Sequence, residues 1–175
     1  LYNKAISDYR QIARTAPAPA EQSLALLNLG VALMHFGAYD RALPFTEVLI
    51  DTFPELAVGY KLKGDALTGL GASAQALEVY RRAFARAGPF ERREIGKAMG
   101  LTALAQHRYR QAYHWLKRSL DVFSLQTAPE DQYHLGVAAL RSGHVEEAKA
   151  VWSYLAAYRL GPEEAALAGQ IDADL

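Results

Sequence analysis

The stretch that decides the fold is Leu24–Leu43, which reads LALLNLGVALMHFGAYDRAL. Its apolar residues recur at spacings of three and four, a period that is typical of an amphipathic helix. Gly30 lies late in one such segment, Gly37 breaks the segment, and Ala42 lies early in a second one. The stretch therefore predicts two helices joined by a short turn. Because Gly30 and Ala42 are small, we expect them to face each other where the two helices meet.

The same spacing recurs three more times along the chain. Each leading glycine precedes its alanine by 12 residues, and the leading glycines are 34, 36 and 36 residues apart. The further copies are Gly64–Gly71–Ala76, Gly100–His107–Ala112, in which His replaces the middle glycine, and Gly136–Gly143–Ala148. A fixed period in this range is typical of stacked repeats. A glycine within a helix costs roughly 1 kcal/mol relative to alanine, so four in register indicate close helix packing.

The repeat resembles the tetratricopeptide repeat (TPR), a helix–turn–helix unit of about 34 residues. The residues that carry the resemblance are Leu29-Gly30, Ala42 and Pro54 in the first full copy, and then Gly64, Ala76, Tyr80, Ala83, Pro89, Gly100, Tyr109, Ala112, Leu135-Gly136, Ala148, Trp152 and Pro162. The resemblance implies an all-α fold, a right-handed superhelical solenoid of antiparallel helix pairs.

On this interpretation a single solenoid occupies residues 1–175. We expect the second helix of a truncated repeat at 1–17, full repeats at 21–54, 55–89, 90–125 and 129–161, and a capping helix or the start of a further repeat at 162–175. Pro44 conflicts with the second helix of the first full repeat, because a proline inside a helix removes a hydrogen bond and bends the axis. We nevertheless expect a helix there.

The amino-acid composition excludes several kinds of site and segment. The absence of cysteine excludes disulfides, thiolate metal sites and cysteine nucleophiles. No apolar run approaches the length of a membrane-spanning helix. The chain begins without Met and shows no signal peptide, so we expect a trimmed chain and a cytoplasmic location.

The net charge is zero but unevenly distributed. Residues 57–128 hold 12 basic and 5 acidic residues, net +7, whereas residues 129–175 hold 3 basic and 8 acidic residues, net −5. Residues 1–56 are net −2, with 4 basic and 6 acidic residues. Such asymmetry bears on partners and association rather than on fold.

The resemblance also implies a binding face, because the first helix of each TPR pair lines a concave groove in which partners usually bind. By position, the groove residues are Asn28, Val31, His35, Lys61, Asp65, Lys97, Leu101, Tyr133, His134 and Arg141. Apolar residues with a few polar groups suit an amphipathic helix or an extended peptide. Lys61 and Lys97 occupy equivalent positions and could together hold a carboxylate. Alternatively, Lys61 pairs with Asp65 one turn along the helix.

A second candidate surface is basic. Arg81-Arg82 and Lys117-Arg118 are 36 residues apart and fall at equivalent places on the outer helices. Adjacent helices pack roughly 10 Å apart, so the four residues would form a basic ridge. The ridge could dock an acidic protein or a nucleic acid backbone. It could equally be an ordinary solvated face.

No catalytic constellation stands out. The five histidines lack the spacing of a metal site, and the glycines do not cluster into a phosphate-binding loop. We therefore expect no enzyme activity, cofactor or metal, and predict a module that binds a peptide or helix of a partner protein in its groove. One alternative is a structural scaffold subunit that self-assembles through its open ends into a homo-oligomer. A nucleic-acid-binding helical-repeat protein is a further alternative, which the zero net charge disfavours.

Overall fold

The computed structural model describes residues 2–16, 18–121 and 126–158, and these residues form helices joined by turns and short connections. The described helices are α1 (Tyr2–Thr15), α2 (Pro19–His35), α3 (Tyr39–Thr52), α4 (Ala57–Gly69), α5 (Ser73–Arg86), α6 (Pro89–Ala105), α7 (Tyr109–Ser119), α8 (Pro129–Arg141) and α9 (Val145–Tyr158). The expected all-α fold is confirmed. The helix expected at 162–175 lies outside the described residues.

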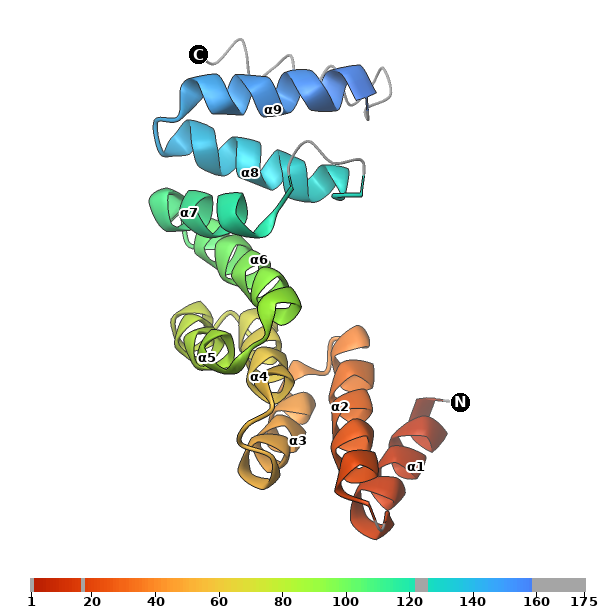
Figure 1. Cartoon of the computed structure of the whole chain (residues 1–175). Coiled ribbons are helices and arrows are strands. Elements are labelled where there is room, and N and C mark those ends of the chain that lie inside the picture. Colours follow the sequence, from red (N-terminus) through yellow and green to blue (C-terminus); the bar gives the residue numbers. More distant parts are fainter. Residues whose placement is uncertain (1, 17, 122–125, 159–175) are drawn as a thin grey trace. The chain divides into compact units, whose positions relative to one another are not determined.

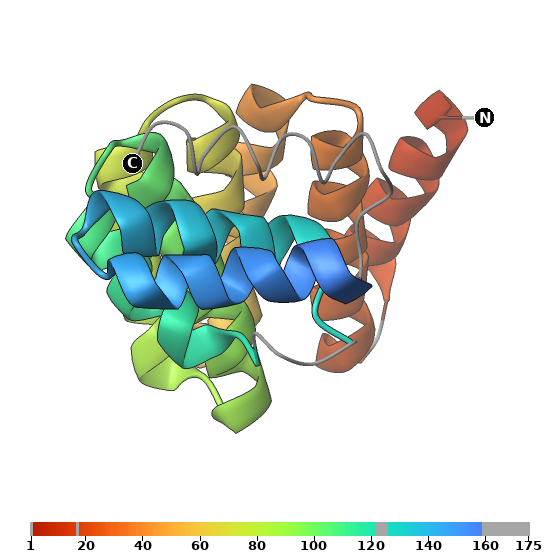
Figure 2. The same ribbon diagram turned by 90° about the horizontal axis from the view of Figure 1, so that it is seen from above.

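The chain divides into two compact units, residues 1–98 and 99–175, with the boundary inside α6. In unit 1, α1 packs on α2, α2 packs on α3 and α4, and α4 packs on α3 and α5 (Figure 1). In unit 2, α8 packs on α7 and α9, and Figure 2 shows α8 and α9 side by side. Each of these helices packs on helices close to it in the sequence, which is the arrangement of a stacked repeat. The repeat boundaries given above stay a prediction.

A residue with a positive φ angle closes the first helix of each pair. Gly37, Gly71 and Gly143 have φ angles of 70°, 75° and 91°, and His107 has a φ of 57°. After Gly37, the Ala38 backbone N–H donates to the Leu33 carbonyl at 2.9 Å, which satisfies one of the open carbonyls at the helix end. The left-handed region costs an ordinary residue about 1–2 kcal/mol. Glycine is therefore favoured at three of these turns, and His107 bears a strain that they avoid.

The leading glycines admit large side chains from a neighbouring helix. A Cβ built on Gly100 would lie 2.6 Å from the Leu116 Cγ, and one built on Gly136 would overlap the Trp152 indole. Leu116 and Trp152 each follow the glycine by 16 residues. In these repeats the residue opposite the glycine therefore lies one helical turn beyond the alanine.

The prediction that Gly30 faces Ala42 is therefore wrong. A Cβ on Gly30 would lie 2.5 Å from Leu62 of α4 and 4.0 Å from Thr46 of α3, so a leucine of the following repeat fills the space. Ala42 belongs instead to a fully buried cluster. The prediction for α3 is confirmed, because the helix continues through Pro44.

Candidate functional site

The candidate site in unit 1 is an apolar row on α2, which we call the α2 stripe and define as Leu24, Leu27, Val31 and Met34. Spacings of three and four place these residues on one face of the helix. Leu24 is 56% exposed and Val31 is 47% exposed, whereas Leu27 and Met34 are half-buried. Exposed apolar residues that lie together on one helix face are typical of an interaction site.

Polar residues flank the α2 stripe at the predicted groove positions. Asn28 is half-buried and His35 is exposed. Asn28 offers an amide that can donate and accept hydrogen bonds, and His35 offers an imidazole at the end of the helix. The stripe therefore combines apolar contact area with polar groups that could fix the orientation of a bound segment.

A polar network on α4 lies beside the α2 stripe, since Leu62 of α4 packs against Gly30 of α2. The Lys61 Nζ lies 2.8 Å from the Asp65 Oδ2, and the two side chains are 31% and 28% exposed. The Tyr80 hydroxyl of α5 donates to the Asp65 Oδ1 at 2.7 Å. The alternative in which Lys61 pairs with Asp65 is thus the arrangement in the structure. Such a pair one turn apart contributes about 0.3–0.5 kcal/mol when exposed.

Lys97, the other predicted cation of the groove, is half-buried and takes part in an interaction of its own. Both lysines of the expected carboxylate clamp therefore have partners within the chain. Joint binding of a carboxylate by Lys61 and Lys97 stays a prediction.

In unit 2 the predicted groove residues divide into two kinds. Leu101 is half-buried and packs against the core cluster that contains Leu116 and Leu135. Tyr133 is 36% exposed, and its ring meets the His134 ring edge to face, with centroids 6.1 Å apart. Tyr133 and His134 therefore form an aromatic pair on α8.

The two polar groove residues of α8, His134 and Arg141, lie in different surroundings. The His134 Nδ1 is buried without a hydrogen-bond partner within the described part of the chain. Arg141, the last residue of α8, is exposed. The exposed Tyr133 ring and the Arg141 guanidinium are of residue types that are enriched at protein interfaces.

The predicted basic ridge divides between the two units. Arg81 and Arg82 lie on α5 of unit 1, and the Arg81 Nη1 lies 3.0 Å from the Glu78 Oε2. Lys117 and Arg118 lie on α7 of unit 2, where the Arg118 Nη1 approaches the His114 Nε2 at 3.4 Å. A ridge shared by all four residues stays a prediction.

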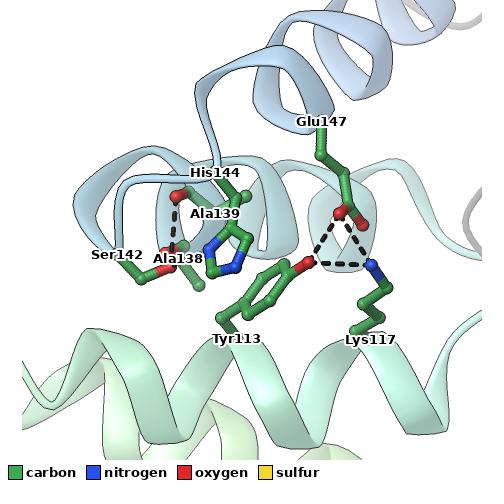
Figure 3. Close-up of polar contacts among 7 residues, drawn as sticks. All are labelled: Tyr113, Lys117, Ala138, Ala139, Ser142, His144 and Glu147. Carbon is green, nitrogen blue, oxygen red and sulfur yellow. Dashed lines mark hydrogen bonds and ion pairs between the residues drawn. The ribbon is translucent and has the colours of Figure 1, made fainter.

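Lys117 is engaged in a compact polar cluster between α7 and α9 (Figure 3). Its Nζ donates to the Glu147 Oε2 at 2.8 Å and to the Tyr113 Oη at 2.8 Å. The Tyr113 hydroxyl donates to the same Glu147 oxygen at 2.6 Å. The Tyr113 ring also stacks on His144, with centroids 3.9 Å apart. These contacts tie α7 to the start of α9, so Lys117 serves the packing of unit 2.

The charges of this cluster stabilise one another. Burial raises the pKa of the Tyr113 hydroxyl, and the hydrogen bond to Glu147 raises it further. The hydrogen bond to Glu147 is also the main reason that the pKa of Lys117 is raised. Burial opposes the charged form of Glu147, but the hydrogen bonds from Lys117 and Tyr113 outweigh it, and the pKa of Glu147 is lowered. At neutral pH the cluster is therefore a formed ion pair with a neutral tyrosine.

The described residues contain neither a cluster of metal-ligating side chains nor a helix of membrane-spanning character. Within residues 2–16, 18–121 and 126–158, no three His, Cys, Asp or Glu side chains come together as a metal site. In the same part of the chain no helix has the length and apolar character needed to cross a membrane.

Paired helices, left-handed turns at a fixed spacing and glycines opposite large side chains define a helical repeat protein. Residues 24–55 match the family model of the tetratricopeptide repeat. These residues are therefore a tetratricopeptide repeat, and the resemblance stated from the sequence is confirmed. No curated protein sequence matches the chain.

Solved structures extend the fold assignment to most of the chain. A crystal structure of MamA has a TM-score of 0.71 and 17% identity, and the match covers 99% of this chain and 92% of that one. YrrB, described as a TPR protein with an unusual peptide-binding site, has a TM-score of 0.71 and 16% identity, with coverages of 94% and 77%.

A thermophilic TPR protein of Thermus thermophilus gives a TM-score of 0.67 at 21% identity, with coverages of 95% and 87%. At these identities the similarity establishes the fold alone. The chain is an all-α TPR solenoid, a fold that supports protein–protein interaction.

Proposed function

We propose that the protein is a non-catalytic interaction module that binds a peptide or an amphipathic helix of a partner protein along the face of α2 and α4. The observation that carries the proposal is the α2 stripe. Leu24 and Val31, two turns apart on α2, expose 56% and 47% of their surface. Burying such side chains against a partner contributes about 25 cal/mol per Å² of apolar surface removed from water.

The polar residues beside the stripe support a segment with mixed chemistry. Lys61 and Asp65 present opposite charges on α4, and the hydrogen bond from Tyr80 restrains the Asp65 carboxylate. A bound helix that places apolar residues on α2 would bring its polar edge to this pair. The peptide-binding site described for YrrB, a protein of the same fold, gives further support.

The test begins with a selection of peptides from a displayed random library against the whole chain, followed by calorimetric titration of a selected peptide. We expect Val31→Asp to weaken binding about tenfold or more, because a carboxylate replaces an apolar contact. Leu70→Asp is the matched control. Leu70 is 46% exposed but follows α4 outside the stripe, so its substitution should leave the affinity unchanged.

Two outcomes would refute the groove proposal. One is a selection that yields no binding peptide. The other is a set of selected peptides whose affinity is the same for the Val31→Asp chain and the unsubstituted chain.

A further inference from the structure

A second surface of unit 1 carries three arginines that are held in place without a carboxylate. We call Arg82, Arg86 and Arg92 the arginine surface. Arg82 and Arg86 are one turn apart on α5, and Arg92 lies in the first turn of α6. All three side chains are exposed. Because α5 is the second helix of its pair, this surface is separate from the proposed groove on α2 and α4.

Aromatic rings position the three guanidinium groups. The Arg82 and Arg86 guanidinium carbons lie 4.9 Å and 4.4 Å from the centroid of the Tyr60 ring. The Arg92 guanidinium carbon lies 5.5 Å from the centroid of the Phe84 ring. An arginine within about 6 Å of a ring centroid is attracted by the electron density on the face of the ring. The rings thus restrict the directions that these long side chains can take.

Backbone carbonyls complete the positioning. The Arg86 Nε donates to the Pro54 carbonyl at 2.9 Å, and its Nη1 donates to the Arg82 carbonyl at 3.0 Å. The Arg92 Nε donates to the Phe84 carbonyl at 3.3 Å. Each guanidinium has five N–H donors, so these bonds leave donors on every one of the three groups.

Two acidic residues close in sequence to these arginines, Glu78 and Glu91, have other partners. Glu78 pairs with Arg81 at 3.0 Å, and the Glu91 Oε2 accepts a hydrogen bond from the Gly88 backbone N–H at 2.9 Å. Within the described residues, no carboxylate lies at ion-pair distance from Arg82, Arg86 or Arg92. The arginine surface is therefore an ordered group of positive charges that lacks its counter-charge.

We propose that the arginine surface binds an acidic helical segment of a partner protein. Guanidinium groups bind carboxylates through two parallel hydrogen bonds. Residues one turn apart are about 6 Å apart along a helix, so Arg82 and Arg86 match two glutamates one turn apart on a partner helix.

The residues of the arginine surface favour a protein over a nucleic acid as the binding partner. Single-stranded nucleic acid is bound on a series of exposed aromatic rings. Here Tyr60 is 2% exposed and lies beneath the two arginines, which leaves Phe90 as the strongly exposed ring of this region. The net charge of the chain is also zero, whereas nucleic-acid-binding domains are generally basic.

The test measures binding of a labelled helical peptide by fluorescence anisotropy. The peptide carries glutamates one turn apart on an alanine background, and a control peptide carries glutamine in their place. We expect the whole chain to bind the glutamate peptide at low salt, with weaker binding at high salt. Arg82→Gln/Arg86→Gln should weaken this binding about tenfold or more, and the glutamine peptide should not bind.

Two further variants separate specific recognition from charge and from folding. Arg41→Gln/Arg110→Gln removes two exposed arginines from α3 and α7 and should leave the affinity unchanged. Arg82→Lys/Arg86→Lys keeps the charges and the aliphatic stems over Tyr60 but loses the planar forks. Its affinity should fall between those of the unsubstituted chain and the glutamine variant, even if the glutamine variant is poorly folded.

Four outcomes would overturn the proposal. The first is the absence of peptide binding at low salt. The second is an equal loss of affinity in Arg41→Gln/Arg110→Gln, which would show a non-specific charge effect. The third is tighter binding of an oligouridylate RNA that the arginine substitutions abolish. The fourth is self-association of the chain that excludes the peptide and disappears in the arginine variant, because the occupant would then be a second copy.

Discussion

Replacing Gly64 with alanine should destabilise unit 1 although alanine is the better helix former. A Cβ at Gly64 of α4 would lie 2.6 Å from the Tyr80 Cδ1 and 2.9 Å from its Cζ, closer than such atoms approach. Tyr80 is 2% exposed, and its hydroxyl donates to the Asp65 Oδ1 at 2.7 Å. The added methyl group must therefore displace a buried ring that is held at both ends.

The expected change in the free energy of unfolding is the sum of three contributions. Overpacking of a core costs about 1–3 kcal/mol, and weakening a hydrogen bond to a charged acceptor costs up to about 1.5–3 kcal/mol. The helix propensity of alanine offsets about 1 kcal/mol. We expect Gly64→Ala to lower the free energy of unfolding by about 2 kcal/mol, measured by urea denaturation and far-ultraviolet circular dichroism.

Gly59→Ala in the same helix is the matched control. Its Cβ would lie 3.3 Å from side-chain carbons of Ile50 and Leu49, which small movements can relieve. Helix propensity then dominates, and the free energy of unfolding should stay constant or rise by up to about 1 kcal/mol. The steric argument is refuted if Gly64→Ala is as stable as the unsubstituted chain, or if both substitutions shift the midpoint equally.

Two further predictions concern unit 2. The lowered pKa of Glu147 means that its contribution to stability is present above the unfolded-state pKa, near 4.3, and is lost as the pH falls through the folded value. The raised pKa values of Lys117 and Tyr113 contribute stability that is lost as the pH rises above about 10. At pH 7 we therefore expect Glu147→Gln to be less stable than the unsubstituted chain, by less than about 1 kcal/mol because the ion pair is exposed. Denaturation measured across the pH range should show this difference vanish in acid. A constant difference at every pH would contradict the prediction. His107→Gly should raise the free energy of unfolding by about 0.5–1 kcal/mol, because glycine tolerates the φ of 57°. A fall in the thermal midpoint would show instead that the 2.8 Å contact between the His107 Nδ1 and the Tyr109 hydroxyl outweighs the backbone strain.

The features that the sequence predicted correctly are local. The helices follow from apolar residues three and four positions apart, and the turns follow from Gly37 and its equivalents, where a left-handed residue ends a helix. The pairing of Lys61 with Asp65 was one of two alternatives and depends on a separation of only four residues. Each of these features can be judged from a short window of the sequence.

The features that the sequence did not predict depend on how successive repeats pack. Leu62 fills the space above Gly30 from the next repeat, whereas residue spacing alone pointed to Ala42. Lys117 was expected on an open ridge, but Glu147, 30 residues further along the chain, neutralises it.

The same reasoning applies to the arginine surface. Arg86 reaches the Pro54 carbonyl across 32 residues, and residue types alone do not show which of several arginines is ordered. Charge patterns located a basic region, and only tertiary contacts distinguish paired from uncompensated cations within it.

The contacts between neighbouring repeats also bear on how the chain folds. Tyr113 and Glu147 are separated by 34 positions, Arg86 and Pro54 by 32, and Gly30 and Leu62 by a similar interval. The loop that must close before any of these contacts forms is therefore about one repeat long, and its entropic cost is nearly the same throughout. Low contact order favours rapid folding. A nascent chain could consolidate each helix pair soon after it is synthesised, without waiting for distant segments.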